Sequence, residues 1–185
     1  HAGFEQGKTV TITSANTSNL LFYNQFDAEK SWIYSRTFTE ADQGKNQGVK
    51  IAENITFANG LQQVKQSQIH LSEQHHVLAH QTLYDYSARA AFTSMHIPLA
   101  ATKGLGYIQE FMKNTTGHLY TSQDFDGDHN FRNPSKVKDD GGGHFSYFSD
   151  NNPHVNIPTA EQYPFQRTLY YNDQNSRVKI RSGAG

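Results

Sequence analysis

A hairpin pattern that occurs twice is the feature of this sequence that most constrains its fold. Near the end of the chain, the aromatic and β-branched stretch 163–171 enters an Asn/Asp/Ser turn at 172–176 and leaves as the alternating stretch 178–181. A related phrase, Thr-Leu-Tyr-Asp-Tyr-Ser-Ala-Arg-Ala, occupies 82–90. Apolar residues at every second position, with turn formers where the chain reverses, predict β-hairpins. Two copies of one hairpin phrase in a short chain indicate a repeat architecture.

The composition favours a β-structure with one wetted face. Of the 185 residues, 35% are hydrophobic and 18% charged, and the 12 Phe and 10 Tyr are too many aromatics for a disordered tail. The net charge of -1 provides no basic field for nucleic acid or an anionic membrane. No run approaches the roughly 18 apolar residues that span a bilayer. The lack of cysteine excludes disulfides and thiolate metal sites.

Alternating segments predict a meander of strands over residues 31–99. Strands are expected at 9–13, 20–26, 31–39, 49–57, 64–71, 77–84 and 90–97. The Asn59-Gly60 pair is a strong hairpin signal between two of them. Residues 100–140 lack periodicity and predict an irregular insertion, and 141–185 predict a loop and a closing hairpin. The expected fold is all-β, a meander of β-hairpins with a long irregular insertion in the middle and no domain boundary.

Three phrases carry a resemblance to a known family. They are Phe-Ala-Asn-Gly-Leu-Gln-Gln at 57–63, Tyr-Asp-x-x-x-Arg at 84–89, and the ending that starts with Tyr-Pro-Phe at 163–165. In this order they resemble the Rhs/YD-repeat proteins, in particular the large forms found in Bacteroidota. The match is most specific over 31–99 and 141–185, whereas the strands of 1–30 match poorly. The residues expected to form the structural repeat are Asn59, Gly60, Tyr84, Asp85, Arg89, Tyr171, Asp173 and Arg177.

The resemblance implies a β-ribbon of hairpins that spirals into a hollow shell. The shell of such proteins encloses a C-terminal, often toxin-like, cargo domain for export and delivery. The resemblance therefore implies a secreted or cell-surface location, the rest of the shell and the cargo as partners, and the type IX secretion machinery as an export partner. Residues 1–185 are expected to be one non-enzymatic segment of a larger chain. We expect such a segment to unfold with poor cooperativity or to aggregate when isolated, because each repeat needs its neighbours.

The residues of the repeat phrase have expected roles in a hairpin turn. Asp85 is expected to accept backbone N–H groups of its own turn. Arg89 is expected to lie across an aromatic ring or to pair with a carboxylate of a neighbouring hairpin, and Tyr84 to bury its ring. The family usually has Gly just before the Arg, where the turn requires a positive φ. This chain departs from that pattern and has Ala88 and Ser176 at those places.

An acidic stretch is the most site-like motif. Asp124, Asp126 and Asp128 occupy positions one, three and five of a pattern that resembles the start of a calcium loop. The sixth position, which favours Gly, is His129, and the twelfth, which favours Glu, is Ser135. The alternative is an acidic, solvated turn. No cofactor other than this calcium is expected.

Histidines suggest two further sites, each with a plainer alternative. The residues of the only histidine cluster are His70, His75, His76 and His80. His76 and His80 would share a face on a helix and hold zinc, but the stretch predicts strand, turn and strand, which separates them. A free N-terminal His1 would chelate copper through its amine and ring. The alternative is that the given sequence begins at an arbitrary residue and that His1 has no such role.

A second class of function stays open beside the shell segment. In this alternative, the chain is a small secreted β-sandwich that binds carbohydrate or acts as a copper enzyme led by His1. Trp32 and the tyrosines would line a flat, sugar-stacking face. The sequence contains no Gly-x-Ser-x-Gly nucleophile motif and no cysteine nucleophile.

Overall fold

The elements of this protein are almost all β-strands. The computed structural model describes residues 9–13, 30–38, 51–71, 76–100, 105–113, 117–125, 147–150, 152 and 156–185. Its elements are β1 Thr9–Thr13, β2 Ser31–Phe38, β3 Ile51–Ala58, β4 Val64–Leu71, β5 His76–Tyr84, β6 Ala90–Ser94, β7 Ile97–Ala100, the 3-10 helix η3 Ser122–Phe125, β8 Phe165–Tyr170 and β9 Val178–Arg181. Each pairing whose register is described is antiparallel. The predicted all-β class is confirmed, while the strand expected at 20–26 lies outside the described residues.

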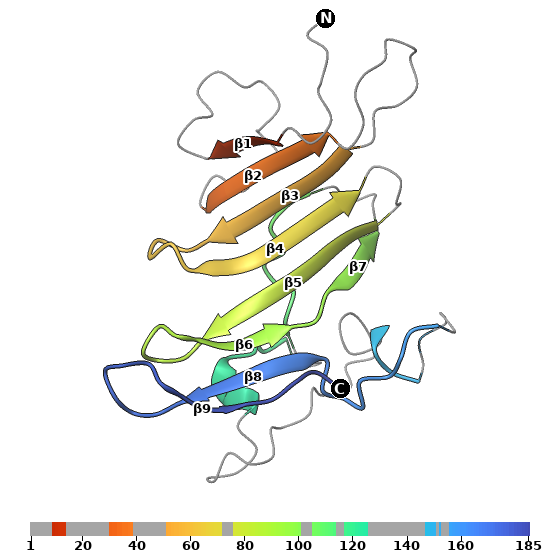
Figure 1. The fold of residues 1–185 in the computed structure, drawn as a ribbon. Helices are drawn as coiled ribbons and strands as arrows, with labels where there is room; N and C mark the ends of the chain where they lie inside the picture. Colours follow the sequence, from red (N-terminus) through yellow and green to blue (C-terminus); the bar gives the residue numbers. More distant parts are fainter. Residues whose placement is uncertain are drawn as a thin grey trace, which may run out of the picture. The chain divides into compact units, whose positions relative to one another are not determined.

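The chain forms two compact units. The first comprises residues 1–79 and 98–107, and the second comprises 80–97 and 108–185. In the first unit β1, β2, β3 and β4 pair in sequence order, and in the second the part of β5 from His80 onward is followed by β6, β8 and β9 (Figure 1). Strand β7 pairs with β5. Between β7 and β8, the described residues 105–113 and 117–125 contain only η3 and a bridge of Lys113 to Leu119, as expected of an irregular insertion.

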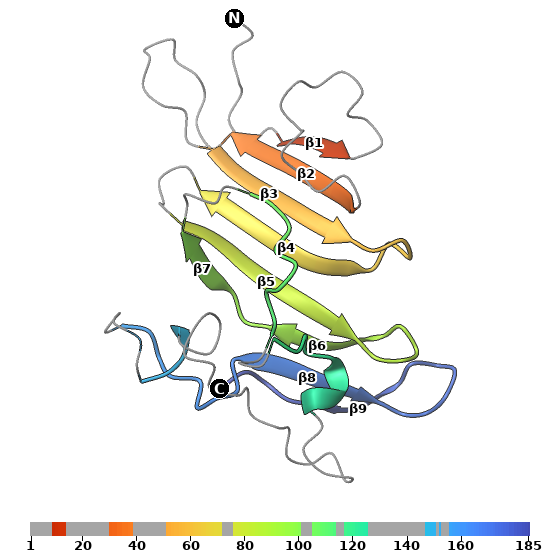
Figure 2. The same cartoon turned by 180° about the vertical axis from the view of Figure 1, so that it is seen from behind.

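The first unit buries alternate residues of its strands on one face. Trp32 and Tyr34 of β2 lie opposite Phe57 and Ile55 of β3, and all four are buried. The segment with Leu105 and Tyr107 runs across this face and packs on the four (Figure 2). Each large side chain removed from water contributes roughly 1.5–3 kcal/mol, so this cluster is the apolar core of the unit.

Two glutamines extend this core with satisfied polar groups. Gln66 and Gln68 of β4 are fully buried, and the Gln68 amide nitrogen donates to Gln66 Oε1 at 2.9 Å. The Gln68 amide also donates to the carbonyl of Gly106 at 2.5 Å and accepts its N–H at 3.0 Å. A buried amide with such partners avoids the desolvation penalty of an unpaired polar group and holds the covering segment in register.

The core of the second unit is aromatic. Phe92 of β6 stacks on Phe125 of η3 and on Phe165 of β8, with ring centroids 4.3 Å and 4.7 Å apart. Leu83, Met112 and Tyr120 complete the buried cluster. Strand alternation places Phe92 and Phe165 on the face that η3 covers, which explains why a short, irregular segment is anchored there.

The strand expected at 90–97 is interrupted, and this part of the prediction was wrong. Strand β6 ends at Ser94 and β7 begins at Ile97. The Ser94 hydroxyl accepts the backbone N–H of Gln81 at 2.9 Å, and the N–H of Met95 donates to the carbonyl of Pro164 at 2.9 Å. These two contacts replace the backbone hydrogen bonds of a continuous strand. The alternation of apolar and polar residues does not indicate this interruption.

Candidate functional site: interlocked hairpin turns and a pocket

The turn between β5 and β6 is closed by Asp85 and Arg89. Asp85 Oδ1 accepts the backbone N–H groups of Ser87 and Arg89, each at 2.9 Å. Its other oxygen, Oδ2, accepts Nε and Nη2 of Arg89, each at 2.8 Å. The backbone of Ala88 takes a φ of 62°. The expected role of Asp85 inside its own turn is borne out by these contacts, and its carboxylate is fully used within the turn.

The turn between β8 and β9 repeats this arrangement. Asp173 Oδ1 accepts the N–H of Asn175 at 3.1 Å, and Asp173 Oδ2 accepts Arg177 Nε at 2.7 Å. Ser176, in the place of Ala88, has a φ of 51°. The hydrogen bond from Arg177 lowers the pKa of Asp173 below its ordinary value. The two phrases recognised in the sequence therefore form the same turn.

The Asn-Gly turn between β3 and β4 is a third example. Asn59 Oδ1 accepts the N–H groups of Leu61 and Gln63 at 3.0 Å, and its amide donates to Gln63 Oε1 at 2.7 Å. The left-handed residue is Gln62, with a φ of 58°, and not Gly60. Asn59 and Gln63 thus correspond in position and contacts to Asp85 and Arg89. Their residue types do not reveal this correspondence.

All three turns place a residue other than glycine in the left-handed conformation, namely Gln62, Ala88 and Ser176. A left-handed backbone costs a non-glycine residue roughly 1–2 kcal/mol. Each hairpin also has a register shift at its turn, after Phe57, Leu83 and Leu169. The hydrogen bonds of the Asp or Asn side chain to the turn backbone offset this strain, so the departures at Ala88 and Ser176 preserve the turn geometry.

Arg89 joins the β5–β6 turn to the β8–β9 hairpin. Its Nη1 donates to the carbonyl of Tyr171 at 3.0 Å, and its guanidinium carbon lies 4.6 Å from the centroid of the Tyr170 ring. The Tyr170 hydroxyl donates in return to the carbonyl of Ala90 at 2.8 Å. As expected, Arg89 packs over an aromatic ring, that of Tyr170 in the neighbouring hairpin. Its carboxylate partner, Asp85, belongs to its own turn. Tyr84, also of the repeat phrase, is partly buried, and burial raises its pKa.

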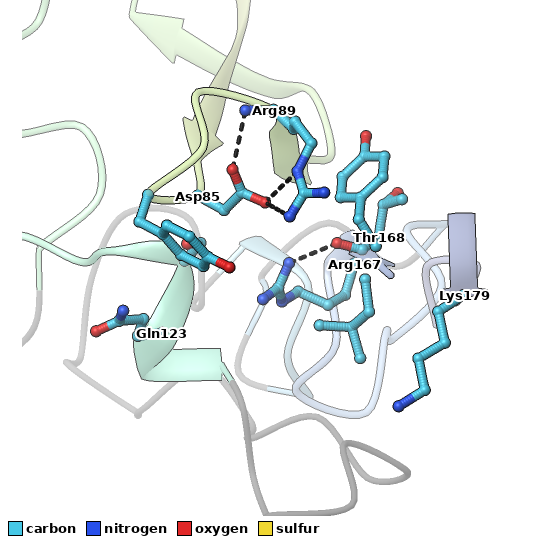
Figure 3. Close-up of a pocket in the computed structure, with 10 residues that line it drawn as sticks. Asp85, Arg89, Gln123, Arg167, Thr168 and Lys179 are labelled. Carbon is cyan, nitrogen blue, oxygen red and sulfur yellow. Dashed lines mark hydrogen bonds and ion pairs between the residues drawn. The ribbon is translucent and has the colours of Figure 1, made fainter. Parts of the chain in front are cut away.

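A pocket of about 280 Å³ lies beside these turns (Figure 3). Its lining residues are Asp85, Tyr86, Arg89, Ser122, Gln123, Arg167, Thr168, Leu169, Tyr170 and Lys179. The guanidinium of Arg167, in β8, lies between Gln123 and Lys179 in the close-up. Arg167 is only 6% exposed, and its Nη1 donates to the carbonyls of Ala91 at 2.6 Å and Thr168 at 2.7 Å. No sequence motif marks Arg167, and its burial distinguishes it from the other arginines of the described residues.

The first unit carries a polar cluster centred on Glu53. Glu53 Oε1 accepts the Tyr34 hydroxyl at 2.5 Å and Arg36 Nη2 at 2.7 Å, and Oε2 lies 3.0 Å from His70 Nδ1. The strand register explains the cluster, because Arg36, Glu53 and His70 lie opposite one another on β2, β3 and β4. Burial alone would raise the pKa of Glu53, but the hydrogen bonds from its neighbours lower it. Burial and this carboxylate raise the pKa of Tyr34.

The candidate histidine site is not assembled in the described residues. His76 and His80 lie in β5 and not on a helix, and His70 contacts Glu53 from β4. The ring of His80 packs on that of His96, with centroids 4.4 Å apart. His75 lies outside the described residues, among which no group of three metal-ligating side chains is found.

The calcium candidate is described only at its first residue. Asp124 lies in η3, and its Oδ2 accepts the N–H of Thr121 at 2.7 Å and the Thr121 hydroxyl at 2.8 Å. Burial alone would raise the pKa of Asp124, but these hydrogen bonds lower it. Asp126 and Asp128 lie outside the described residues. In the described part, Asp124 therefore closes a local turn.

The alternative functions depend on Trp32 and His1, of which the structure describes only Trp32. Trp32 is 5% exposed and belongs to the core of the first unit, so it does not line an open sugar-stacking face. His1 lies outside the described residues.

Where the chain is described, none of its helices has the length and apolar character needed to cross a membrane. Comparison with protein-family models, curated proteins and solved structures found no match to this chain.

Proposed function

We propose that this chain is a structural, non-catalytic segment of a secreted Rhs/YD-repeat protein. In this proposal its hairpins stack side by side and form part of a shell that encloses and delivers a C-terminal, toxin-like cargo domain. The family, the cargo and export through the type IX machinery are implied by the resemblance of the hairpin phrases. The stacking itself is supported by contacts between the hairpins.

The contact of Arg89 with Tyr171 is the observation that carries the proposal. Both residues belong to copies of the same phrase, and they join two hairpins at their turns. Tyr86 adds a hydrogen bond from its hydroxyl to Asn172 Oδ1 at 3.1 Å. A repeat protein gains its stability from such contacts between neighbouring units, so residues of the phrase that serve these contacts favour a stacking role.

The β8–β9 hairpin carries an arginine and a tyrosine, Arg177 and Tyr171, that could contact a further hairpin in the same way. Arg177 occupies the place of Arg89 and packs over Tyr171 of its own turn, with its guanidinium carbon 5.2 Å from the ring centroid. Its side chain is 67% exposed, against 12% for Arg89. Strand β9 is the last of the described strand order, and its residues are all exposed. A next hairpin would pair with β9 and place the aromatic end of its strand under Arg177.

Addition of a hairpin to β9 tests the proposal directly. A peptide of residues 163–185 contains Tyr170 and Tyr171, the two residues that Arg89 contacts. We expect this peptide to bind the whole chain and to protect the amides of β9 from hydrogen exchange. The same peptide with Tyr170 and Tyr171 replaced by Ser should bind more weakly. Arg181→Pro in the receiving chain should abolish the protection, because the N–H of Arg181 faces away from β8 and proline removes this donor from the open edge. Equal binding of the two peptides would contradict the proposal.

The unfolding of the isolated chain is a second test. A segment that depends on neighbouring repeats should melt broadly or aggregate, and its β9 amides should exchange faster than those of β3. A sharp, reversible, two-state melt with uniform protection would overturn the idea that the chain needs further hairpins.

A further inference from the structure

We propose that the strand that pairs with the open edge of β9 carries a carboxylate opposite Arg181. Strand β9, Val178–Arg181, is the last of the described strand order, and all of its residues are exposed. Its side chains are alternately aliphatic and cationic, and none is anionic. This inference rests on the proposed function and names the chemistry of the next hairpin.

The backbone N–H of Arg181 is directed at the open edge. The N–H of the following residue, Ser182, donates to the carbonyl of Arg167 in β8 at 2.9 Å. The N–H groups of successive strand residues point to opposite sides, so that of Arg181 faces away from β8. A strand added at this edge would form a hydrogen-bonded pair with Arg181. In such a pair the two side chains lie next to each other on one face of the sheet.

The side chain of Arg181 has a neutral partner. Its Nη2 donates to Gln166 Oε1 at 3.3 Å, which is its one polar contact within the described part of the chain. This distance is longer than the usual N–H···O distance, whereas guanidinium and carboxylate form shorter, charge-assisted bonds. Lys179 adds a second positive charge two residues away. Charge complementarity therefore favours an acidic strand at this edge.

The two hairpins of the second unit indicate which residue of the next hairpin would face Arg181. Thr93 of β6 lies opposite Thr82, in the second pair from the register shift of its hairpin. Arg181 lies opposite Thr168, in the same place of the β8–β9 hairpin. On its other side, Thr93 lies opposite Gln166 of β8. Since Arg181 has the place of Thr93, we expect Glu or Asp in the place of Gln166.

A second copy of this chain is a poor occupant of the same edge. Two antiparallel β9 strands centred on Arg181 would place two arginines opposite each other. If the strands were centred on Ile180, Arg181 would lie opposite Lys179 of the other copy. Like charges directly opposite each other are destabilising, so β9 disfavours pairing with itself.

Three peptides of residues 163–171 test the inference: the parent sequence, Gln166→Glu and Gln166→Lys. They end before β9, because Arg181 within a longer peptide would contact residue 166. Each peptide is titrated into the whole chain, and protection of the β9 amides from hydrogen exchange gives its affinity. We expect the Glu peptide to bind about tenfold more tightly than the Lys peptide, from one favourable and one unfavourable cross-strand pair. Salt should reduce the difference. Equal affinities of these two peptides would overturn the inference.

Variants of the receiving chain assign the effect to Arg181. Arg181→Gln should reduce the difference between the Glu and Lys peptides to about twofold, because only the more distant Lys179 remains. Lys113→Gln removes an exposed lysine outside β9 and should preserve the difference. If Arg181→Gln also preserves it, the peptides respond to general charge and the inference is wrong.

The parent peptide separates this inference from the proposed function. If all three peptides protect β9 equally well, hairpin addition is supported and the carboxylate is refuted. If none protects β9, strand addition fails and the inference fails with it. Sedimentation of the chain alone tests the competing occupant. A dimer whose β9 amides are protected would show that a second copy occupies the edge, contrary to the inference.

Discussion

Arg89 Nη1 donates to the backbone carbonyl of Tyr171 at 3.0 Å, across 82 residues of sequence. The same guanidinium is bound by Asp85 of its own turn and packs over the ring of Tyr170. One side chain thus closes a turn and fastens it to the next hairpin. This dual use explains why an arginine, with five N–H donors in a planar fork, occupies the end of the phrase.

Arg89→Ala should loosen the β5–β6 turn much more than Arg177→Ala loosens the β8–β9 turn. Arg89 is largely buried and its loss leaves Asp85 without its charged partner, which should cost about 2–4 kcal/mol. Arg177 makes the equivalent bond in an exposed turn, where water replaces it. Native-state hydrogen exchange at Ser87 and Asn175 measures the two local opening energies. Equal losses would show that the contact with the neighbouring hairpin contributes nothing.

Ala88→Gly should stabilise the protein by roughly 0.5–1 kcal/mol. Its φ of 62° penalises a Cβ by more than the extra chain entropy that glycine brings to the unfolded state. The control is Ala90→Gly, two residues later in β6, where glycine should destabilise by a similar amount. The denaturant midpoints of both variants are compared with that of the parent chain. A loss of stability with Ala88→Gly would mean that the Cβ has a packing role.

Acid should destabilise the second unit through His80. Burial, with a smaller effect from His96, lowers the pKa of His80 from 6.5 to about 4. Since the folded pKa lies below the unfolded one, the contribution is present above pH ~6.5 and is lost as the pH falls toward 4. After allowance for solvent screening we expect a loss of about 1–2 kcal/mol.

Variants at two histidines check this assignment. His80→Phe should flatten the stability profile between pH 6.5 and 4, because it removes the group that gains a proton on unfolding. His118→Gln, at an exposed histidine, should leave the profile unchanged. Hydrogen exchange of Thr82 and Phe92 at several pH values reports the second unit alone. A profile that persists in His80→Phe would assign the transition to another group.

Glu53→Gln should destabilise the first unit by about 2–3 kcal/mol. The carboxylate accepts hydrogen bonds from Tyr34 and Arg36 and contacts His70, so its neutralisation leaves partly buried donors with a weaker acceptor. Glu110→Gln, at an exposed ion pair, should change stability by less than about 0.5 kcal/mol. Exchange of the Thr56 amide is the measurement. A loss no larger than that of Glu110→Gln would show that the cluster is fully solvated.

Local information in the chain was sufficient for most of the described strands and for the Asp85 turn. The alternation in β2, β4 and β5 depends on neighbouring residues only, so it predicted these strands within one residue at each described end. The Asp85 turn was predictable for the same reason, since its bonds lie within five consecutive residues. The left-handed residue of the Asn59 turn was not, because Gly60 is the more permissive residue while the side chain of Asn59 positions Gln62 there.

The sequence by itself therefore determined the all-β class, the positions of most strands and the chemistry of the turns. The tertiary structure decided what those turns contact: the carbonyl of Tyr171 for Arg89, the cluster around Glu53, and the pocket around Arg167. It also decided that Trp32 is buried and that β6 ends at Ser94. The physical reason is one of range. Alternation and turn formation are settled by residues a few positions apart, whereas these contacts join residues from separate strands, which strand pairing and core packing bring together.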